Sequence, residues 1–197
     1  MPDGHRPRLP GVRKVGGEGD PEVFVADEQQ AVPIDTVRWA SLAEAVLVAE
    51  GVRGNVELSL LFVAEDDIAE LNREFLGKGE PTDVLAFPID AAEVEVLSVP
   101  APSSSGPDRS APDPGDLPLL LGDVVVCPAV AERQAPTHAG TLDDELALLV
   151  VHGVLHVLGH DHAEPDERAR MRARERALLE AHHWRGPTPG GFRQEHD

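Results

Sequence analysis

The spacing of apolar residues changes repeatedly along the chain, which predicts strands and helices in turn. Runs with strand character cover residues 22–27, 55–66, 83–88 and 119–127. Apolar residues recur at helical spacing over 34–51 and 64–77, and a further helix is expected to begin near Pro128. Residues 141–159 give the strongest helix signal, and an arginine-rich helix is expected over 164–184. This mixture predicts an α/β or α+β fold.

Two stretches lack any such spacing and set the expected domain limits. Residues 1–20 are rich in Gly, Pro and charge, and residues 90–118 are crowded with Pro, Ser, Gly and Asp. We therefore expect a disordered N-terminal tail over 1–20 and one domain over 21–185 that carries an extended insertion at 90–118. Residues 186–197 are expected to form a C-terminal tail.

Composition and charge narrow the classes of function. The 197 residues include 36 acidic residues and 17 Lys or Arg, for a net charge of −19, which argues against a surface that coats nucleic acid generally. The single cysteine, Cys127, excludes an intrachain disulfide and is interpreted as a small buried residue. No signal peptide is evident, and the longest apolar run is too short to span a bilayer. We expect a cytoplasmic protein without membrane contact.

Four of the nine histidines fall within thirteen residues, 150–162. His152 and His156 are four apart, so on a helix both imidazoles lie on one face and can bind one zinc ion. Gly159 can end the helix, and His162 can then fold back over the pair. The pattern H-x-x-x-H-x-x-G-x-x-H predicts a metal site with three imidazoles and an open fourth position for water.

Alternatives to this set remain at the sequence level. His160 is the rival third ligand, and a single histidine in an apolar helix is more often a hydrogen-bonded core residue. Zinc proteases share the spacing but carry a glutamate general base after the first histidine, where this chain has Gly153. Peptide hydrolysis by that mechanism is therefore not expected.

Three segments together resemble the YbeY family of zinc-dependent endoribonucleases. "HGVLHVLGHDH" matches the family signature, "LNREFLGKGEPTDVLAFP" (71–88) resembles a second conserved motif, and "LLGDVVVC" (120–127) resembles a third. The resemblance covers roughly residues 22–184. It implies a small single domain, a sheet of about four strands packed with about five helices, in which the zinc-site helix is central.

The resemblance also implies a function and a site. One Zn²⁺ per chain would be held by His152, His156 and His162, with a zinc-bound water as the nucleophile. The substrate would be single-stranded RNA, in 3′-end maturation of small-subunit rRNA and in ribosome quality control. The small ribosomal subunit or its proteins would be partners, and DNA would not. The alternatives are a non-catalytic, metal-binding ribosome assembly factor and a metal hydrolase of another substrate.

One departure from the family pattern concerns phosphate binding. The frequent family arginine before "GK" is Leu76 here, and we expect Arg73 or Lys78 to replace it as a catalytic cation. Arg168, Arg172 and Arg176 recur every four residues and predict either a phosphate track or a solvated face. In the second reading, these arginines pair with Glu164, Glu167, Glu175 and Glu180.

Overall fold

A mixed five-stranded sheet forms the centre of the molecule. The computed structural model describes residues 13–15, 19–89, 118–160 and 164–194. The sheet order is β1-β2-β3-β5-β4. β2 (Glu22–Asp27), β3 (Val56–Phe62) and β5 (Leu119–Val126) run parallel, and β4 (Val84–Pro88) is antiparallel to β5. The α/β fold class is confirmed.

A short fifth strand lies at one edge of the sheet. β1 (Arg13–Val15) pairs antiparallel with Val23–Val25 of β2. These three residues fall inside the segment 1–20 that was predicted to be a disordered tail, so the prediction is wrong at this point. The amino-acid composition of a segment cannot predict whether a neighbouring strand edge offers it backbone hydrogen bonds. The rest of 1–18, and the expected insertion from 90 to 117, lie outside the described residues.

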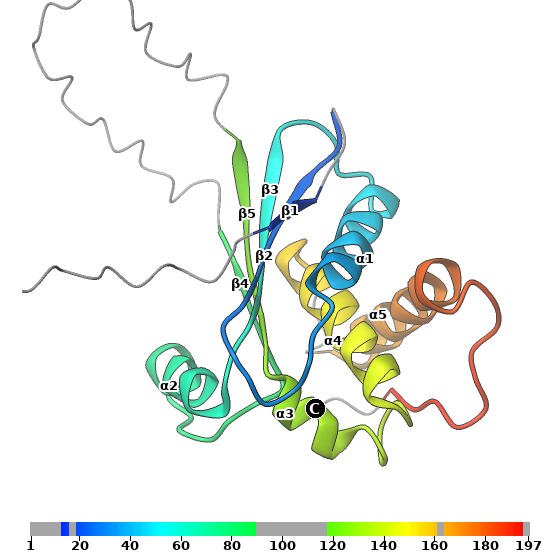
Figure 1. Ribbon diagram of the computed structural model, residues 1–197. Helices are drawn as coiled ribbons and strands as arrows, with labels where there is room; N and C mark the ends of the chain where they lie inside the picture. The colour runs from blue at the N-terminus through cyan, green and yellow to red at the C-terminus, as the bar shows by residue number, and fades with distance from the viewer. Residues whose placement is uncertain (1–12, 16–18, 90–117, 161–163, 195–197) are drawn as a thin grey trace, which may run out of the picture.

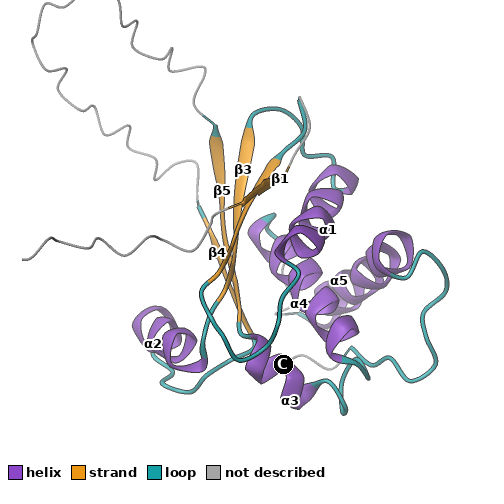
Figure 2. Cartoon of the chain, in the orientation of Figure 1, coloured by secondary structure: helices purple, strands orange, loops and turns teal. Residues whose placement is uncertain are grey.

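Helices cover both faces of the sheet (Figure 1). α1 (Thr36–Ala49) and α4 (Leu142–Val157) pack side by side on one face, and α5 (Pro165–Leu178) contacts α4. α2 (Glu65–Leu76) lies across the opposite face, and α3 (Pro128–Gln134) follows β5 directly. The colouring by secondary structure in Figure 2 shows the sheet between these two helical layers. A π-helical turn, η2 (Leu179–His183), continues α5.

α4 is the most deeply buried helix on the first face. Eleven of its sixteen residues are buried, and they face the sheet, α1, α3 and α5. A helix that is apolar on nearly every side belongs in the interior, as the sequence indicated. Thr141 caps it, because the Thr141 side chain accepts a hydrogen bond from the Asp144 backbone N–H over 3.1 Å. The expected zinc-site helix is therefore held rigidly.

The core has two parts, one on each face of the sheet. The larger part joins β2, β3 and β5 to α1, α4 and the end of α5. The smaller part lies on the α2 side and includes Val63, Ile68, Leu85 and Cys127. Burial raises the pKa of the Cys127 thiol, in keeping with its expected role as a small buried residue.

Candidate metal centre and active-site cleft

His152 and His156 lie one helical turn apart on α4 and converge at their Nε2 atoms. The two nitrogens are 3.1 Å apart, and the rings meet edge to face with centroids 4.4 Å apart. Two imidazoles on one tetrahedral zinc, each about 2.0–2.1 Å from it, place their nitrogens roughly 3.3 Å apart. The observed separation fits a shared metal ion. Among the described residues, no group of three possible metal ligands is present.

Glu175 fixes the orientation of one of these imidazoles. Its Oε1 lies 2.7 Å from His152 Nδ1, and its Oε2 accepts a hydrogen bond from Gln194 Nε2 over 2.9 Å. When Nδ1–H donates to the carboxylate, the lone pair of Nε2 is left for a metal. Only 3% of Glu175 is exposed, so the expectation that it belongs to a solvated face of α5 is wrong. Its partner is 23 positions away, beyond the reach of helical spacing rules.

The chain leaves α4 at Gly159, which has the left-handed φ of +88°. This is the expected end of the helix. His160 follows and turns away from the pair, so that its Nε2 lies 3.3 Å from Glu50 Oε2 at the end of α1. His162, the preferred third ligand, lies outside the described residues.

Gly153 explains why no general base stands after His152. A Cβ atom on Gly153 would lie 2.5 Å from Cγ1 of Val124 on β5, closer than carbon atoms approach in proteins. α4 therefore packs against the sheet only because position 153 has no side chain. The absence of a glutamate here has a steric cause.

A cleft of about 1020 Å³ opens beside the histidine pair. α2 and the loop after it, β4, the end of α3, α4 and α5 supply its walls. The residues lining it include Asn72, Phe75, Leu76, Lys78, Gln134, His138, His152, His156 and Arg172. One part of its rim is apolar, because Phe75 and Leu76 are 58% and 59% exposed. The rings of Phe75 and Phe87 lie 4.9 Å apart at this rim.

Two cations from different elements line the cleft. Lys78 lines it, whereas Arg73 is exposed and does not. Asn72 positions the loop of Lys78, because its Nδ2 donates to Glu80 O over 2.7 Å and its backbone O accepts from Lys78 N. Arg172 of α5 is the second cation. Lys78 thus lines the same cleft as the histidine pair, and so does Arg172, which the sequence placed on either a phosphate track or a solvated face.

Two further polar residues of the cleft were missed at the sequence level. His138 Nδ1 lies 3.3 Å from Oε1 of Glu145, which is completely buried on α4. Gln134 Oε1 is buried and has no hydrogen-bond partner among the described residues. Neither belongs to a recognisable spacing pattern, since His138 lies in a loop and Gln134 ends a short helix.

Comparison with known proteins shows to which family the chain belongs. A sequence profile described as "Endoribonuclease YbeY" matches residues 24–183. The chain belongs to the YbeY family.

Individual YbeY relatives match nearly the whole domain. An endoribonuclease YbeY from Salinispora tropica is 45% identical over 163 residues, which are 83% of this chain and 96% of the relative. One from Thermobifida fusca is 42% identical over 157 residues, covering 80% and 91%. The solution structure of TM1509 from Thermotoga maritima superposes with a TM-score of 0.51 at 26% identity, covering 83% and 91%. The family inferred from the three motifs is confirmed.

No helix within the described ranges is long and apolar enough to cross a membrane.

Proposed function

We propose that this chain is a metal-dependent endoribonuclease that cuts single-stranded RNA in the cytoplasm, acting in 3′-end maturation of small-subunit rRNA and in ribosome quality control. The observation that carries the proposal is the convergence of His152 Nε2 and His156 Nε2, 3.1 Å apart, on a cleft that also holds Lys78 and Arg172. The names of the YbeY relatives support an RNA substrate.

His152, His156 and His162 are the residues we propose as ligands of one zinc ion. When bound, zinc supplies a Lewis acid and lowers the pKa of a coordinated water to about 7. Glu175 keeps the His152 ring turned toward that position through its 2.7 Å contact with Nδ1. Because His160 contacts Glu50 instead, we favour His162 over His160 as the third ligand.

Lys78 and Arg172 are proposed to bind the phosphate to be cleaved. They approach the cleft from the α2 side and from α5, so a phosphodiester between them meets positive charge on two sides. Leu76, where the family pattern has arginine, contributes only apolar surface to the same cleft. We assign the phosphate-binding role to Lys78 rather than to Arg73, and Arg172 shares it.

The apolar rim suits an unpaired base. Phe75 is 58% exposed although the whole chain has only five phenylalanines, two tryptophans and no tyrosine. Unstacked bases of single strands bind by stacking on such aromatic faces, which bases inside a duplex cannot do. This rim favours a single-stranded substrate.

Gln134 lines the cleft and bears on the choice between ribose and deoxyribose. Gln134 Oε1 is buried without a partner in the described part of the chain, which costs stability unless a ligand supplies a donor. A ribose 2′-hydroxyl donates such a hydrogen bond, and deoxyribose lacks it. We propose that the Gln134 amide turns toward the cleft when RNA binds and accepts this bond, which selects RNA over DNA.

The test is cleavage of a labelled RNA that contains the 3′ end of a small-subunit rRNA precursor. Wild type is expected to cleave it, and both a zinc chelator and His156→Ala are expected to abolish cleavage. His162→Ala should lose bound zinc together with activity, whereas His160→Ala is the matched histidine control and should retain one zinc per chain. Zinc content would be measured by atomic emission.

Other results would point elsewhere. Zinc retained in wild type without cleavage of any RNA would favour the non-catalytic assembly factor, which Leu76 in place of arginine also favours. Cleavage that survives in His156→Ala would indicate a contaminating nuclease. Zinc lost from His160→Ala but kept in His162→Ala would exchange the two histidines in the ligand set.

A further inference from the structure

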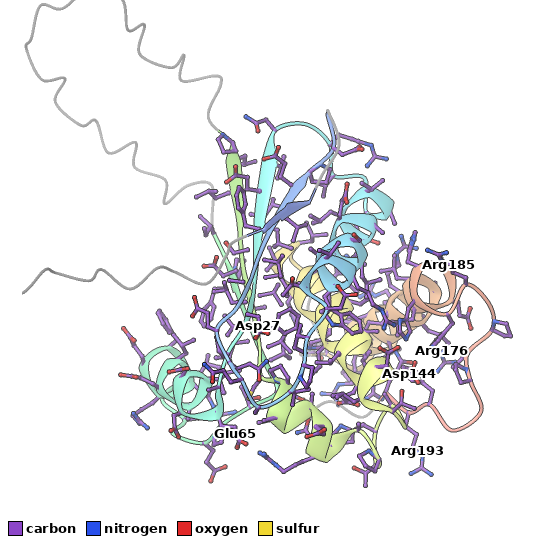
Figure 3. The ribbon with its side chains drawn as sticks, viewed as in Figure 1. Asp27, Glu65, Asp144, Arg176, Arg185 and Arg193 are labelled. Atoms are coloured by element: carbon purple, nitrogen blue, oxygen red, sulfur yellow. The ribbon has the colours of Figure 1, made fainter. Side chains whose placement is uncertain are left out.

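A second cavity of about 580 Å³ lies next to the cleft, between α5 and the segment that follows η2. Three arginines line it, together with three alanines of α5, and the whole lining comprises Ala169, Arg172, Ala173, Arg176, Ala177, Glu180, Phe192, Arg193, Gln194. Arg172 lines both this arginine cavity and the cleft, so the two cavities share a wall. Figure 3 labels Arg176 on α5 and Arg193 on the following segment.

The C-terminal segment is tied to both cavities by hydrogen bonds. Arg193 N donates to His138 O over 3.1 Å, and His138 lines the cleft. Gln194 Oε1 accepts from the Arg176 guanidinium over 3.1 Å, while its Nε2 donates to Arg172 O and to Glu175 Oε2. Arg176 and Arg193 are therefore held on the walls of the cavity beside the site.

The four glutamates that could pair with the arginines lining this cavity are largely engaged elsewhere. Glu164 and Glu167 form the capping box of α5, and Glu175 binds His152 and Gln194. Glu180 lines the cavity, but its carboxylate accepts two hydrogen bonds from Thr188, at 2.6 and 3.2 Å. These bonds hold the pKa of Glu180 below its usual range, so it stays ionised and attracts Arg176.

Within the described ranges, the guanidinium groups of Arg172 and Arg193 form no ion pair or hydrogen bond, although both residues are exposed. Carboxylates are abundant in this chain, with 36 acidic residues against 17 Lys and Arg. Two guanidinium groups without a carboxylate partner in the described part of so acidic a chain suit an anionic ligand from outside. Arg172 and Arg176 are one turn apart, about 6 Å along the helix, similar in scale to the spacing of phosphates along a single strand.

We propose that the arginine cavity binds the phosphodiester backbone of the RNA strand beyond the cleft, with Arg176 and Arg193 as phosphate ligands and Arg172 at the junction. The inference rests on the proposed ribonuclease function and extends it to a binding site outside the reacting centre. Arginine suits this role, because its planar group donates two parallel hydrogen bonds to a phosphate.

The experiment uses zinc-loaded protein and labelled phosphorothioate oligouridylates, which keep the backbone charge and resist hydrolysis. One oligonucleotide fills only the cleft, and a longer one extends past Arg172. Affinity is measured by anisotropy over a series of KCl concentrations. Wild type is expected to bind the longer strand more tightly and with the steeper salt dependence.

The double variant Arg176→Gln/Arg193→Gln should weaken binding of the longer strand about tenfold or more. Its log-log salt slope should fall by about 1.4, since each phosphate contact of a single strand contributes about 0.7. Arg176→Lys/Arg193→Lys keeps the charges and should keep most of the slope. Arg170→Gln is the matched control, because Arg170 is an exposed arginine of α5 that does not line either cavity, and it should bind as wild type does.

Wild-type affinity and slope in the double Gln variant would overturn the proposal, and so would lost affinity with an unchanged slope, which indicates damage to the fold. Polyglutamate that competes better than polyuridylate would overturn it in favour of an acidic protein partner. These results leave cleavage by wild type intact. Wild type that neither binds nor cleaves any RNA would instead refute the proposed function, and the arginine site with it.

Discussion

Glu175 is a buried carboxylate, and its removal should lower the affinity for zinc as well as the stability of the fold. Glu175→Ala frees the His152 ring to rotate, so we expect zinc affinity to fall about 10- to 100-fold. Glu175→Gln keeps a hydrogen-bond acceptor for Nδ1–H and should lie between wild type and Ala. Competition with a chromophoric chelator measures the affinity.

The matched control for this substitution is Glu132→Ala, at an exposed position of α3. It should bind zinc as wild type does. Unchanged zinc affinity in Glu175→Ala would show that His152 needs no orienting partner.

Gln134 should show a gain in stability coupled to a loss of function. Gln134→Met removes an unpaired buried acceptor, which costs about 1–3 kcal/mol, so unfolding by urea should need the same denaturant concentration or more. The same variant should lose most of its preference for ribose over 2′-deoxy strands. Cleavage rates on matched RNA and 2′-deoxy-substituted strands measure that preference.

Gln29→Met provides the contrast, because both the oxygen and the nitrogen of the buried Gln29 amide form hydrogen bonds. Its Nε2 donates to Val32 O over 2.7 Å, and its Oε1 accepts from the N–H groups of Ala31 and Val32. This variant should be destabilised while its substrate preference stays as in wild type. A Gln134→Met protein as unstable as Gln29→Met would mean that the Gln134 acceptor is paired after all.

Gly153 sets how closely α4 approaches the sheet. In Gly153→Ala the added methyl meets Val124 Cγ1 at 2.5 Å, and we expect overpacking to cost about 1–3 kcal/mol against at most about 1 kcal/mol gained in helix propensity. Adding Val124→Ala makes room, so the double variant should show a favourable coupling energy in a urea-unfolding cycle.

Gly190→Ala is the control for this pair, because a Cβ there meets nothing within 4 Å and its φ is not positive. It should change stability by only a few tenths of a kcal/mol. Additive effects at positions 153 and 124 would argue against the steric account.

At the scale of elements, α4 joins the histidine pair to the C-terminal segment. Asp144 in its first turn accepts hydrogen bonds from Trp184 Nε1 over 2.6 Å and from Thr141 Oγ1 over 2.8 Å, and its Oδ1 lies 2.8 Å from His183 Nε2. Burial alone would raise the pKa of Asp144, but these hydrogen bonds and the charge of His183 outweigh it and hold the pKa below its usual value.

The lowered pKa of Asp144 determines how the free energy of unfolding changes with pH. A depressed pKa gives stability that is complete above the unfolded value of about 3.9 and is lost as pH falls through the folded value. Asp144→Asn should therefore cost about 1–3 kcal/mol at pH 7, and its stability should converge with that of wild type in strong acid. Urea titrations followed by circular dichroism across pH 2–7 measure both curves.

Asp143→Asn is the neighbouring control, since Asp143 forms an exposed ion pair with Arg38 and lies only at the outer limit of contact with His183, 3.9 Å from its Nε2. It should change stability little at any pH. A constant difference between wild type and Asp144→Asn down to pH 2 would mean that charge plays no part in the Asp144 contacts.

The sequence predicted those elements whose limits depend on nearby residues, such as a capping side chain or a closing glycine. α4 begins after Thr141 and ends before Gly159 as expected, and α2 ends at Gly77, which has a φ of +70°. The helical spacing of His152 and His156 predicted their convergence. Long-range contacts could not be predicted in this way. The partnership of Glu175 with His152 and the pairing of β1 with β2 depend on where the chain returns in space.

At the scale of the whole molecule, charge should act on stability and on RNA binding with opposite signs. The net charge of −19 makes the folded state repel itself, so salt should raise the melting temperature by screening that repulsion. The same salt should weaken RNA binding at the cleft that Lys78 and Arg172 line. Calorimetry and RNA anisotropy over KCl concentrations below about 0.2 M test both trends, where the Debye length is still several ångströms.

The neutral osmolyte sucrose is the control, since it stabilises folded proteins by exclusion and does not screen charge. It should raise the melting temperature without weakening RNA binding. A melting temperature that falls with added KCl would show that attractive charge pairs outweigh the net repulsion.

The two tryptophans of the chain both flank His183. The ring of Trp39 on α1 lies 6.4 Å from that of His183, and the ring of Trp184 lies 5.6 Å from it. Neither indole is among the described residues that line the cleft. Intrinsic tryptophan emission is thus a built-in optical reporter of the docking of the C-terminal segment against α1 and α4. It should change when that segment detaches and stay constant when a ligand fills the cleft alone.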